Sequence, residues 1–98
     1  MSEFRLTYLA DQDLEHIWNV INENNGARVA NRIELELRDA MRLLADHPGI
    51  GHRRPDVRNP RYRFWSVYKF VIAYRPDSRP LEIGRVVHGG RNFKRLFK

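Results

Sequence analysis

Residues 27–46 have the sequence ARVANRIELELRDAMRLLAD, in which apolar side chains recur at every third or fourth position. The recurring apolar positions are Ala30, Ile33, Leu37, Ala40, Met41 and Leu44. This spacing places them on one face of an α-helix, while Glu34, Arg38 and Arg42 lie at i, i+4 intervals on the solvent-exposed face. The segment therefore predicts an amphipathic helix over about 27–46.

A shorter helix is expected immediately before this one. Its apolar positions at helical spacing are Leu14, Ile17, Trp18 and Ile21. Either Asp11 or Asp13 offers an N-cap, and the sequence Asn-Asn-Gly at 24–26 ends the helix with residues that tolerate the left-handed conformation. Because the connection is so short, the two helices are expected to form an antiparallel hairpin.

Strands are expected before and after this hairpin. Alternating apolar and polar residues predict a strand over 4–8, and three more are expected over 62–67, 70–75 and 81–88. The Pro-Gly sequence after residue 47 ends the second helix, and PDSRP at 76–80 has the composition of a hairpin turn.

The last strand should divide its side chains strictly between two faces of the sheet. Leu81, Ile83, Arg85 and Val87 are expected on one face, and residues 82, 84, 86 and 88 on the other. The predicted order is β-α-α-β-β-β in a single domain over 1–98. This is an α+β fold in which an antiparallel sheet packs against an N-terminal helical hairpin.

Positive charge is concentrated in the second half of the chain. Residues 1–51 carry five Lys and Arg against nine Asp and Glu, a net charge of −4, whereas residues 52–98 carry thirteen against three, a net charge of +10. Such an asymmetry indicates a polyanion or an acidic protein as partner, and arginine is favoured where phosphate or carboxylate is bound in a bidentate manner. A generally solubilising basic surface is the alternative.

Composition also narrows the classes of protein to consider. The absence of cysteine excludes disulfides and thiolate metal sites, which suits a cytoplasmic protein. No stretch approaches the roughly 18 consecutive apolar residues of a membrane span, and the N-terminus lacks the pattern of a secretory signal. The four histidines lack the paired spacing of a zinc site, so neither a metal nor a cofactor is expected.

Four segments carry a more specific signal through their order and spacing. They are YLADQDLEHIW at 8–18, LLADHPGIGHRR at 43–54, RFW at 63–65 with VIAYR at 71–75, and IGRVVHGGRN at 83–92. Together these segments resemble the RelE/ParE toxin superfamily and, within it, the ParE or plasmid-stabilisation branch. One departure is Asn92, where many relatives have Asp.

The resemblance implies the toxin of a type II toxin–antitoxin system. Relatives of the ParE branch poison DNA gyrase, and relatives of the RelE branch cut mRNA in the ribosome. Both are neutralised by a cognate antitoxin whose C-terminal segment wraps the toxin, and the antitoxin usually binds the operator DNA. We therefore expect a toxin that poisons gyrase by binding and that contacts operator DNA only through an acidic antitoxin.

A ribosome-dependent ribonuclease is the principal alternative. His88 would act as acid or base, and the cations facing the phosphate would come from Arg54, Arg63 and Arg91 together with Arg75 and Arg85. However, His88 is equally explained by a hydrogen bond to the turn that follows it. The chain also has no Tyr after Tyr74 and no Glu within 47–60, so the residue sets of RelE-type nucleases are incomplete. Whether the protein is an enzyme stays open, with the balance against it.

The charge split leads to a hypothesis about binding surfaces. The basic sheet face and tail would bind the target through Arg75, Arg85, Arg91, Lys94 and Arg95. An exposed apolar strip formed by Phe93, Leu96 and Phe97 would bind the antitoxin, unless this tail instead packs on its own sheet and completes the core. A non-toxic module that binds nucleic acid or protein is the third alternative.

Overall fold

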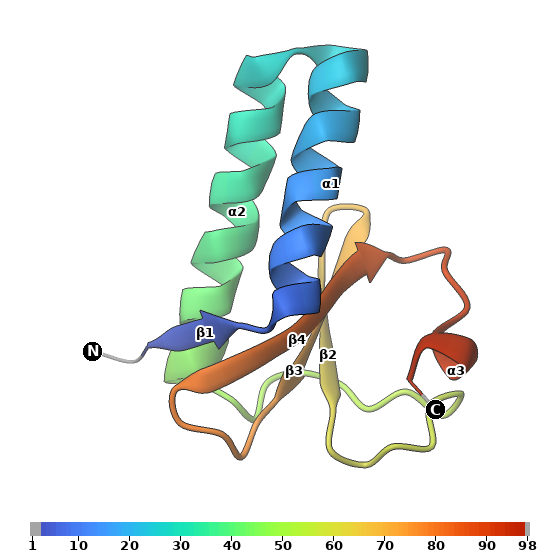
Figure 1. Ribbon diagram of the computed structural model, residues 1–98. Coiled ribbons are helices and arrows are strands. Elements are labelled where there is room, and N and C mark those ends of the chain that lie inside the picture. The colour runs from blue at the N-terminus through green and yellow to red at the C-terminus, as the bar shows by residue number, and fades with distance from the viewer. Residues whose placement is uncertain (1–2, 98) are drawn as a thin grey trace.

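The computed structural model of the protein describes residues 3–97. Its elements, in chain order, are β1 (Phe4–Leu6), α1 (Tyr8–Asn25), α2 (Ala27–Asp46), β2 (Arg63–Val67), β3 (Phe70–Arg75), β4 (Leu81–His88) and α3 (Phe93–Leu96) (Figure 1). The predicted α+β fold and its β-α-α-β-β-β order are confirmed. The short helix α3 in the tail was not predicted.

The strands of the described residues form one mixed sheet. Its order is β1-β4-β3-β2, and β2, β3 and β4 pair in antiparallel fashion. However, β1 runs parallel to β4, with Phe4 opposite Leu81, so the expected wholly antiparallel sheet is wrong at this edge. The alternation of apolar residues predicts a strand but carries no information about the direction of its neighbour.

A bulge interrupts the alternation of β4. Tyr74 on β3 pairs with Ile83 and Ala73 pairs with Arg85, which leaves Gly84 as the extra residue. Beyond the bulge, Val86 joins Ile83 in the core beneath the helices, and the expected division of side chains in β4 is therefore wrong after residue 83. A Cβ at Gly84 would lie 2.9 Å from Cε1 of Tyr62, so this ring packs directly on the backbone of the bulge.

Helix α1 begins earlier than the sequence suggested. Its N-cap is Thr7, whose hydroxyl accepts from the amide of Ala10 at 3.1 Å, rather than Asp11 or Asp13. Tyr8 therefore belongs to the helix and not to the first strand. The same Thr7 hydroxyl donates to the carbonyl of Gly84 at 2.8 Å and so connects the helix start to the bulge.

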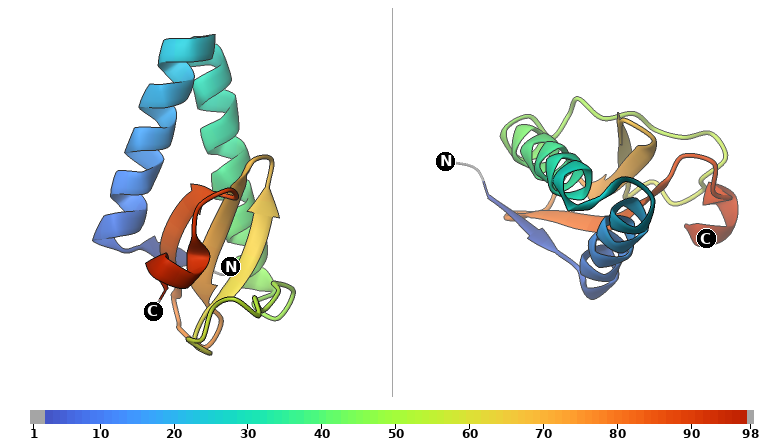
Figure 2. Two further views of the ribbon diagram at one scale, coloured as in Figure 1. Left: turned by 90° about the vertical axis from the view of Figure 1, so that its right-hand side faces the viewer. Right: turned by 90° about the horizontal axis from the view of Figure 1, so that it is seen from above.

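The helical hairpin covers one face of the sheet and buries the larger core (Figure 1). Its buried residues are Ala10, Leu14, Ile17, Ile33, Leu37, Met41, Leu44, Ala45, Ile72, Tyr74, Leu81, Ile83 and Val86. The predicted stripe of α2 thus faces this core through Ile33, Leu37, Met41 and Leu44, and that of α1 through Leu14 and Ile17. Trp18, which was predicted in the α1 stripe, lies outside this core and donates to the Asn31 side chain on α2 at 2.8 Å. The tip of the hairpin projects beyond the strands, as Figure 1 and the left view of Figure 2 show. Within the described residues, no helix combines the length and apolarity needed to cross a membrane.

A second, smaller core lies on the opposite face of the sheet. It contains Phe64, Val71, Ala73, Val87, Phe93 and Phe97, with Val57, Tyr62 and Leu96 packed against it. The tail that carries α3 and the loop between α2 and β2 therefore cover this face together, away from the helical hairpin (Figure 2).

Candidate functional site

Arg85, an expected target-binding residue, is engaged inside the protein. Its Nε and a terminal nitrogen donate to the carboxylate of Asp13 on α1 at 2.7 and 3.0 Å, and the amide of Val86 donates to the same carboxylate at 2.9 Å. The hydrogen bonds with Asp13 raise the pKa of Arg85 above its ordinary value. Arg85 thus ties β4 to α1, and it is not a free cation.

Arg75 is also surrounded by acidic groups. Its side chain lies 3.9 Å from a carboxylate oxygen of Asp77 and 3.9 Å from one of Glu82, which additionally accepts from Arg5 at 2.6 Å. The remaining acid of the second half of the chain, Asp56, pairs with Arg54 at 3.2 Å. All three acids of residues 52–98 are therefore engaged with arginines, and the excess positive charge resides elsewhere.

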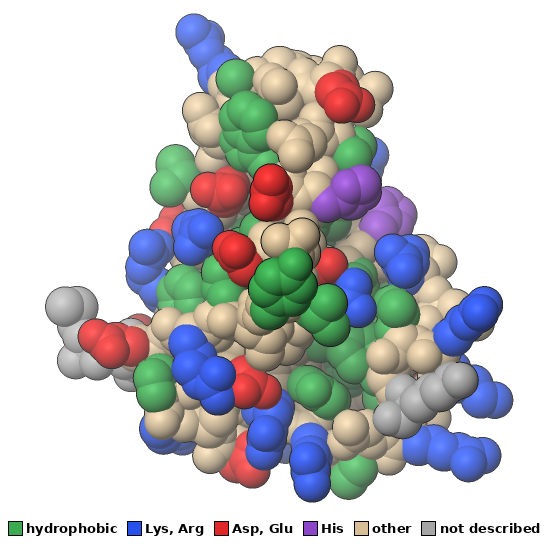
Figure 3. All heavy atoms as spheres, viewed as in Figure 1, with side chains coloured by type: hydrophobic (Ala, Val, Ile, Leu, Met, Phe, Trp, Pro, Cys, Tyr) green, Lys and Arg blue, Asp and Glu red, His purple; other side chains and the backbone are tan. Residues whose placement is uncertain are grey.

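Five of the exposed cations that have no carboxylate partner come from two segments, the loop between α2 and β2 and the helix α3. They are Arg53, Arg58, Arg61, Lys94 and Arg95, which we call the cationic patch. Among the described residues, none of the five lies within ion-pair distance of a carboxylate. Lys and Arg side chains are prominent along the lower right of Figure 3, where Figure 1 places α3 and the end of the chain.

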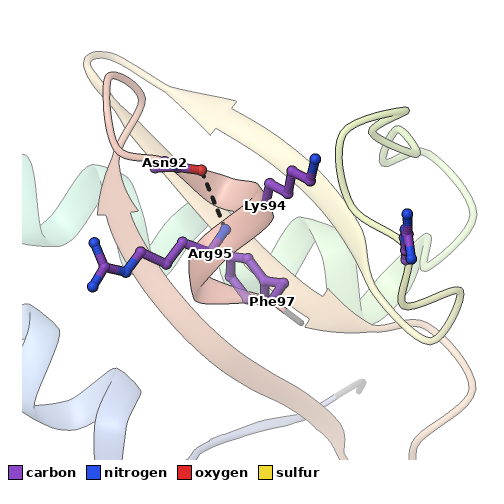
Figure 4. Close-up of a pocket in the computed structure, with 5 residues that line it drawn as sticks. Asn92, Lys94, Arg95 and Phe97 are labelled. Atoms are coloured by element: carbon purple, nitrogen blue, oxygen red, sulfur yellow. Dashed lines mark hydrogen bonds between the residues drawn. The ribbon is translucent and has the colours of Figure 1, made fainter.

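The centre of the patch is a shallow cavity of about 500 Å³. It is lined by Arg58, Asn92, Lys94, Arg95 and Phe97. The Asn92 side chain caps α3 by accepting from the amide of Arg95 at 3.2 Å, and Lys94 and Arg95 extend in opposite directions from the helix (Figure 4). The cavity therefore receives cations from both the loop and the tail.

Buried aromatic rings hold the tail in this position. Phe93 is 1% exposed and Phe97 is 6% exposed, and both rings contact Phe64 at centroid distances of 5.9 and 5.3 Å. The guanidinium of Arg54 lies 3.9 Å from the centre of the Phe93 ring. The tail therefore packs on its own sheet and completes the core, which was one of the two interpretations of the sequence. Of its three apolar residues, only Leu96 is partly exposed.

Hydrogen bonds fix the loop that carries the other half of the patch. The buried hydroxyl of Tyr74 donates to the carbonyl of Pro48 at 2.7 Å and accepts from the amide of Gly51 at 2.9 Å. Burial raises the pKa of Tyr74. Arg63 donates to the carbonyl of Gly51 at 3.0 Å. This arginine, a candidate cation of the ribonuclease alternative, therefore stabilises the loop.

A groove lies between the helical hairpin and the end of the sheet. It consists of two adjoining cavities of about 380 and 190 Å³ that share Val20, Ile21, Phe70 and His88. Val20 is 41% exposed, and Tyr68, at the β2–β3 turn, is 69% exposed with a φ of 57°. Basic side chains in the groove are His16, Arg32, Lys69, His88 and Arg91. We call this the hairpin groove.

Sequence comparison assigns the chain to a family. Residues 4–93 match the family model described as "ParE toxin of type II toxin-antitoxin system, parDE". The chain belongs to this family of ParE toxins. Toxin ParE1 of Caulobacter vibrioides is 33% identical over 92 residues, which are 94% of either chain. Toxin ParE3 of the same organism is 30% identical over 80 residues, which are 82% of this chain and 79% of ParE3.

A solved structure has the same fold as this ParE-family chain. It is described as "Chromosomal ParDE TA system from P. aeruginosa", with a TM-score of 0.75 and 20% identity. The similarity covers 90% of this chain and 96% of the other one. The predicted superfamily and its ParE branch are therefore confirmed.

The residues considered for RNA cleavage in this ParE-family chain are divided between separate places. His88 and Arg91 line the hairpin groove, whereas Arg54 stacks on the tail and Arg63 braces the loop. His88 also uses its Nδ1 atom to accept from the amide of Gly90 at 3.0 Å, as the structural interpretation of this histidine expected. Among residues 3–97, no three His, Asp or Glu side chains gather closely enough to hold a metal ion.

Sequence reasoning found part of these surfaces and missed the rest. The structure brings Lys94 and Arg95 together with Arg58, which was not singled out, and places Arg91 in the hairpin groove instead. Val20 is an apolar residue of α1 that does not belong to its buried face. An apolar side chain outside the predicted stripe was therefore the sequence signal for the groove.

Proposed function

We propose that this ParE-family toxin arrests growth by binding and poisoning DNA gyrase, without catalysis of its own. The observation that carries the proposal is the cationic patch, which presents exposed cations without a carboxylate partner from the loop and the tail. The proposal is further supported by the match to ParE toxins along almost the whole chain. The division of His88, Arg91, Arg54 and Arg63 among separate sites is unfavourable for a ribonuclease, whose acid, base and cations must converge on one phosphate.

We assign the target-binding role to the cationic patch. Lys94 and Arg95 keep the target-binding role expected from the sequence. Arg75 and Arg85 are no longer assigned to it, because their charges already face carboxylates. Arg58, Arg53 and Arg61 from the loop replace them. Exposed cations of this kind steer a negatively charged target towards the surface and raise the rate of encounter.

We further propose that a cognate acidic antitoxin neutralises the toxin by docking in the hairpin groove. The solved neighbour comes from a ParDE toxin–antitoxin system, which supports an antitoxin as the partner of this chain. The groove combines exposed apolar side chains at Val20 and Tyr68 with surrounding cations, which suits a segment that alternates apolar and acidic residues. The tail supplies no comparable strip, because Phe93 and Phe97 are buried.

Induced expression in bacterial cells tests the proposed activity. We expect growth arrest accompanied by DNA damage signalling and by broken DNA attached to gyrase, with transcripts intact. Cleaved transcripts and an early loss of translation would instead establish the ribonuclease alternative. Unimpaired growth with folded protein present would favour a non-toxic interaction module. Gyrase and its DNA are cytoplasmic, so the proposed action requires no passage across a membrane.

A further inference from the structure

The cationic patch and the hairpin groove differ in composition in a way that bears on what each surface binds. The large apolar side chains that are exposed on the described residues are Tyr8, Leu9, Val20, Leu35, Leu43, Ile50 and Tyr68. Of these, only Ile50 belongs to the loop between α2 and β2, and none belongs to the tail after His88. The aromatic rings beneath the patch, including Phe93 and Phe97, pack in the second core and are not available to a partner.

This composition favours a polynucleotide over a protein as the ligand of the patch. Protein partners obtain most of their binding energy from a few buried anchors, usually aromatic residues or arginines that fill fully desolvated pockets. The patch exposes no aromatic anchor. The backbone of a nucleic acid requires only cations and hydrogen-bond donors, and arginine binds its phosphates in a bidentate manner.

Hydrogen bonds and buried rings order the backbone that carries the cations of the patch. On the loop side, Arg53 donates to the carbonyl of Pro60 at 3.0 Å, and the Asn59 side chain accepts from the amide of Arg61 at 3.0 Å. On the tail side, Asn92 caps α3, and the buried phenylalanines fix this helix on the sheet. Because the backbone is already ordered, binding a phosphate would cost little backbone conformational entropy, and the cost that remains is that of ordering the exposed side chains.

We propose that the cationic patch binds the phosphate backbone of double-stranded DNA, through Arg58 from the loop and Lys94 and Arg95 from the tail. This inference rests on the proposed action on gyrase, because the duplex in question is the DNA that gyrase holds. The toxin then contacts the nucleic acid of its target as well as the enzyme. Contacts of this kind follow the shape and charge of the backbone and do not depend on the base sequence.

The test measures how binding of the purified chain to a short fluorescent duplex depends on salt. Between about 50 and 200 mM salt, the logarithm of the binding constant should fall linearly with that of the salt concentration, with a slope of about −0.9 for each phosphate contacted. The double variant Arg58→Gln, Arg95→Gln should reduce this slope by about 1.8, since it removes two contacts.

The matched control removes the same charge from α2 and from the turn between β3 and β4, which contribute no residue to the patch. Arg28 and Arg79 are exposed, and the variant Arg28→Gln, Arg79→Gln should retain the wild-type slope. Equal slopes for the two double variants would overturn the proposal. So would tighter binding of a single-stranded RNA or of polyglutamate than of the duplex, since these probes represent an RNA and an acidic protein.

The two proposals fail in different ways. Duplex binding that depends on Arg58 and Arg95, without any effect on gyrase, would leave the patch as a DNA-binding surface and reject the proposed target. Conversely, the protein could poison gyrase while its duplex binding does not depend on Arg58 or Arg95. That result would support gyrase as the target and reject the proposed DNA contact.

Discussion

The hydroxyl of Tyr74 on β3 accepts a hydrogen bond of 2.9 Å from the amide of Gly51, 23 positions earlier in the chain. The same hydroxyl donates to the carbonyl of Pro48. A single buried group therefore fixes the beginning of the long loop to the centre of the sheet, where backbone amides and carbonyls would otherwise lack partners. The position of the cations later in that loop depends on this attachment.

Replacement of Gly51 should reveal how closely the loop approaches Tyr74. A Cβ on Gly51 would overlap the Tyr74 hydroxyl, whereas a Cβ on Gly49 would meet no atom within 4 Å. We expect Gly51→Ala to lower the free energy of unfolding by about 2 kcal/mol, as overpacking of a core does. Gly49→Ala, measured beside it by urea denaturation, should change it little; equal effects would contradict the contact.

The stability of the protein should fall at high pH partly because of Tyr74. Burial raises the pKa of this hydroxyl above its ordinary value of 10.0. As the pH rises past about 10, the unfolded chain loses this proton while the folded chain keeps it, so the free energy of unfolding decreases. Urea denaturation between about pH 9 and 11 should show a shallower decrease for Tyr74→Phe than for the wild type.

The control for that experiment is Tyr8→Phe, because the Tyr8 side chain is 76% exposed. This variant should retain the wild-type pH dependence. Tyr74→Phe should also be less stable near neutral pH by about 1–2 kcal/mol, since the amide of Gly51 and the carbonyl of Pro48 lose their shared partner. Identical pH profiles for the wild type and Tyr74→Phe would show that this hydroxyl titrates alike in both states.

The attachment of α1 to β4 depends on Asp13. Its carboxylate accepts from Arg85 and from the amide of Val86, and the two charged side chains are 15% and 21% exposed. We expect Asp13→Asn to lower the free energy of unfolding by about 2 kcal/mol, because charge-assisted hydrogen bonds are lost from a partly buried site. Asp11→Asn, an exposed change in the same turn, should cost less than about 1 kcal/mol. Thermal denaturation of both variants is the measurement.

Neutralisation by the antitoxin should depend on Val20. Val20→Asp places a negative charge in the hairpin groove and removes an apolar contact, so the variant should arrest growth but escape its cognate antitoxin on co-expression. Leu35→Asp is the control, since Leu35 is 61% exposed on α2 and lies outside the groove. Antitoxin that rescues cells from the Val20 variant as fully as from the wild type would argue against this docking site.

The helices and the order of elements were predictable because their signals are local. The apolar stripe of α2 is visible at three- and four-residue spacing, and it faces the core as expected. The direction of β1 and the bulge at Gly84 were not predictable, since they depend on which strand lies alongside. Thr7 was missed because two nearby aspartates offered equally good caps.

The charge asymmetry predicted a basic surface but could not identify its members. Arg85 and Asp13 are 72 positions apart, so the sequence gives no sign that they neutralise each other. Phe93 and Phe97 have the same apolar character whether they bind a partner or fill a core, and only their packing against Phe64 distinguishes the two. Long-range contacts decided both cases.

The most direct test incubates the purified chain with purified gyrase and supercoiled plasmid and measures the broken DNA trapped on the enzyme. We predict that the wild type and Arg28→Gln, Arg79→Gln trap broken DNA alike. The variant Arg58→Gln, Arg95→Gln should require at least about tenfold more protein, which corresponds to about 1.4 kcal/mol of binding. Folded wild-type chain that arrests growth yet leaves gyrase unaffected at every concentration would contradict the proposed action.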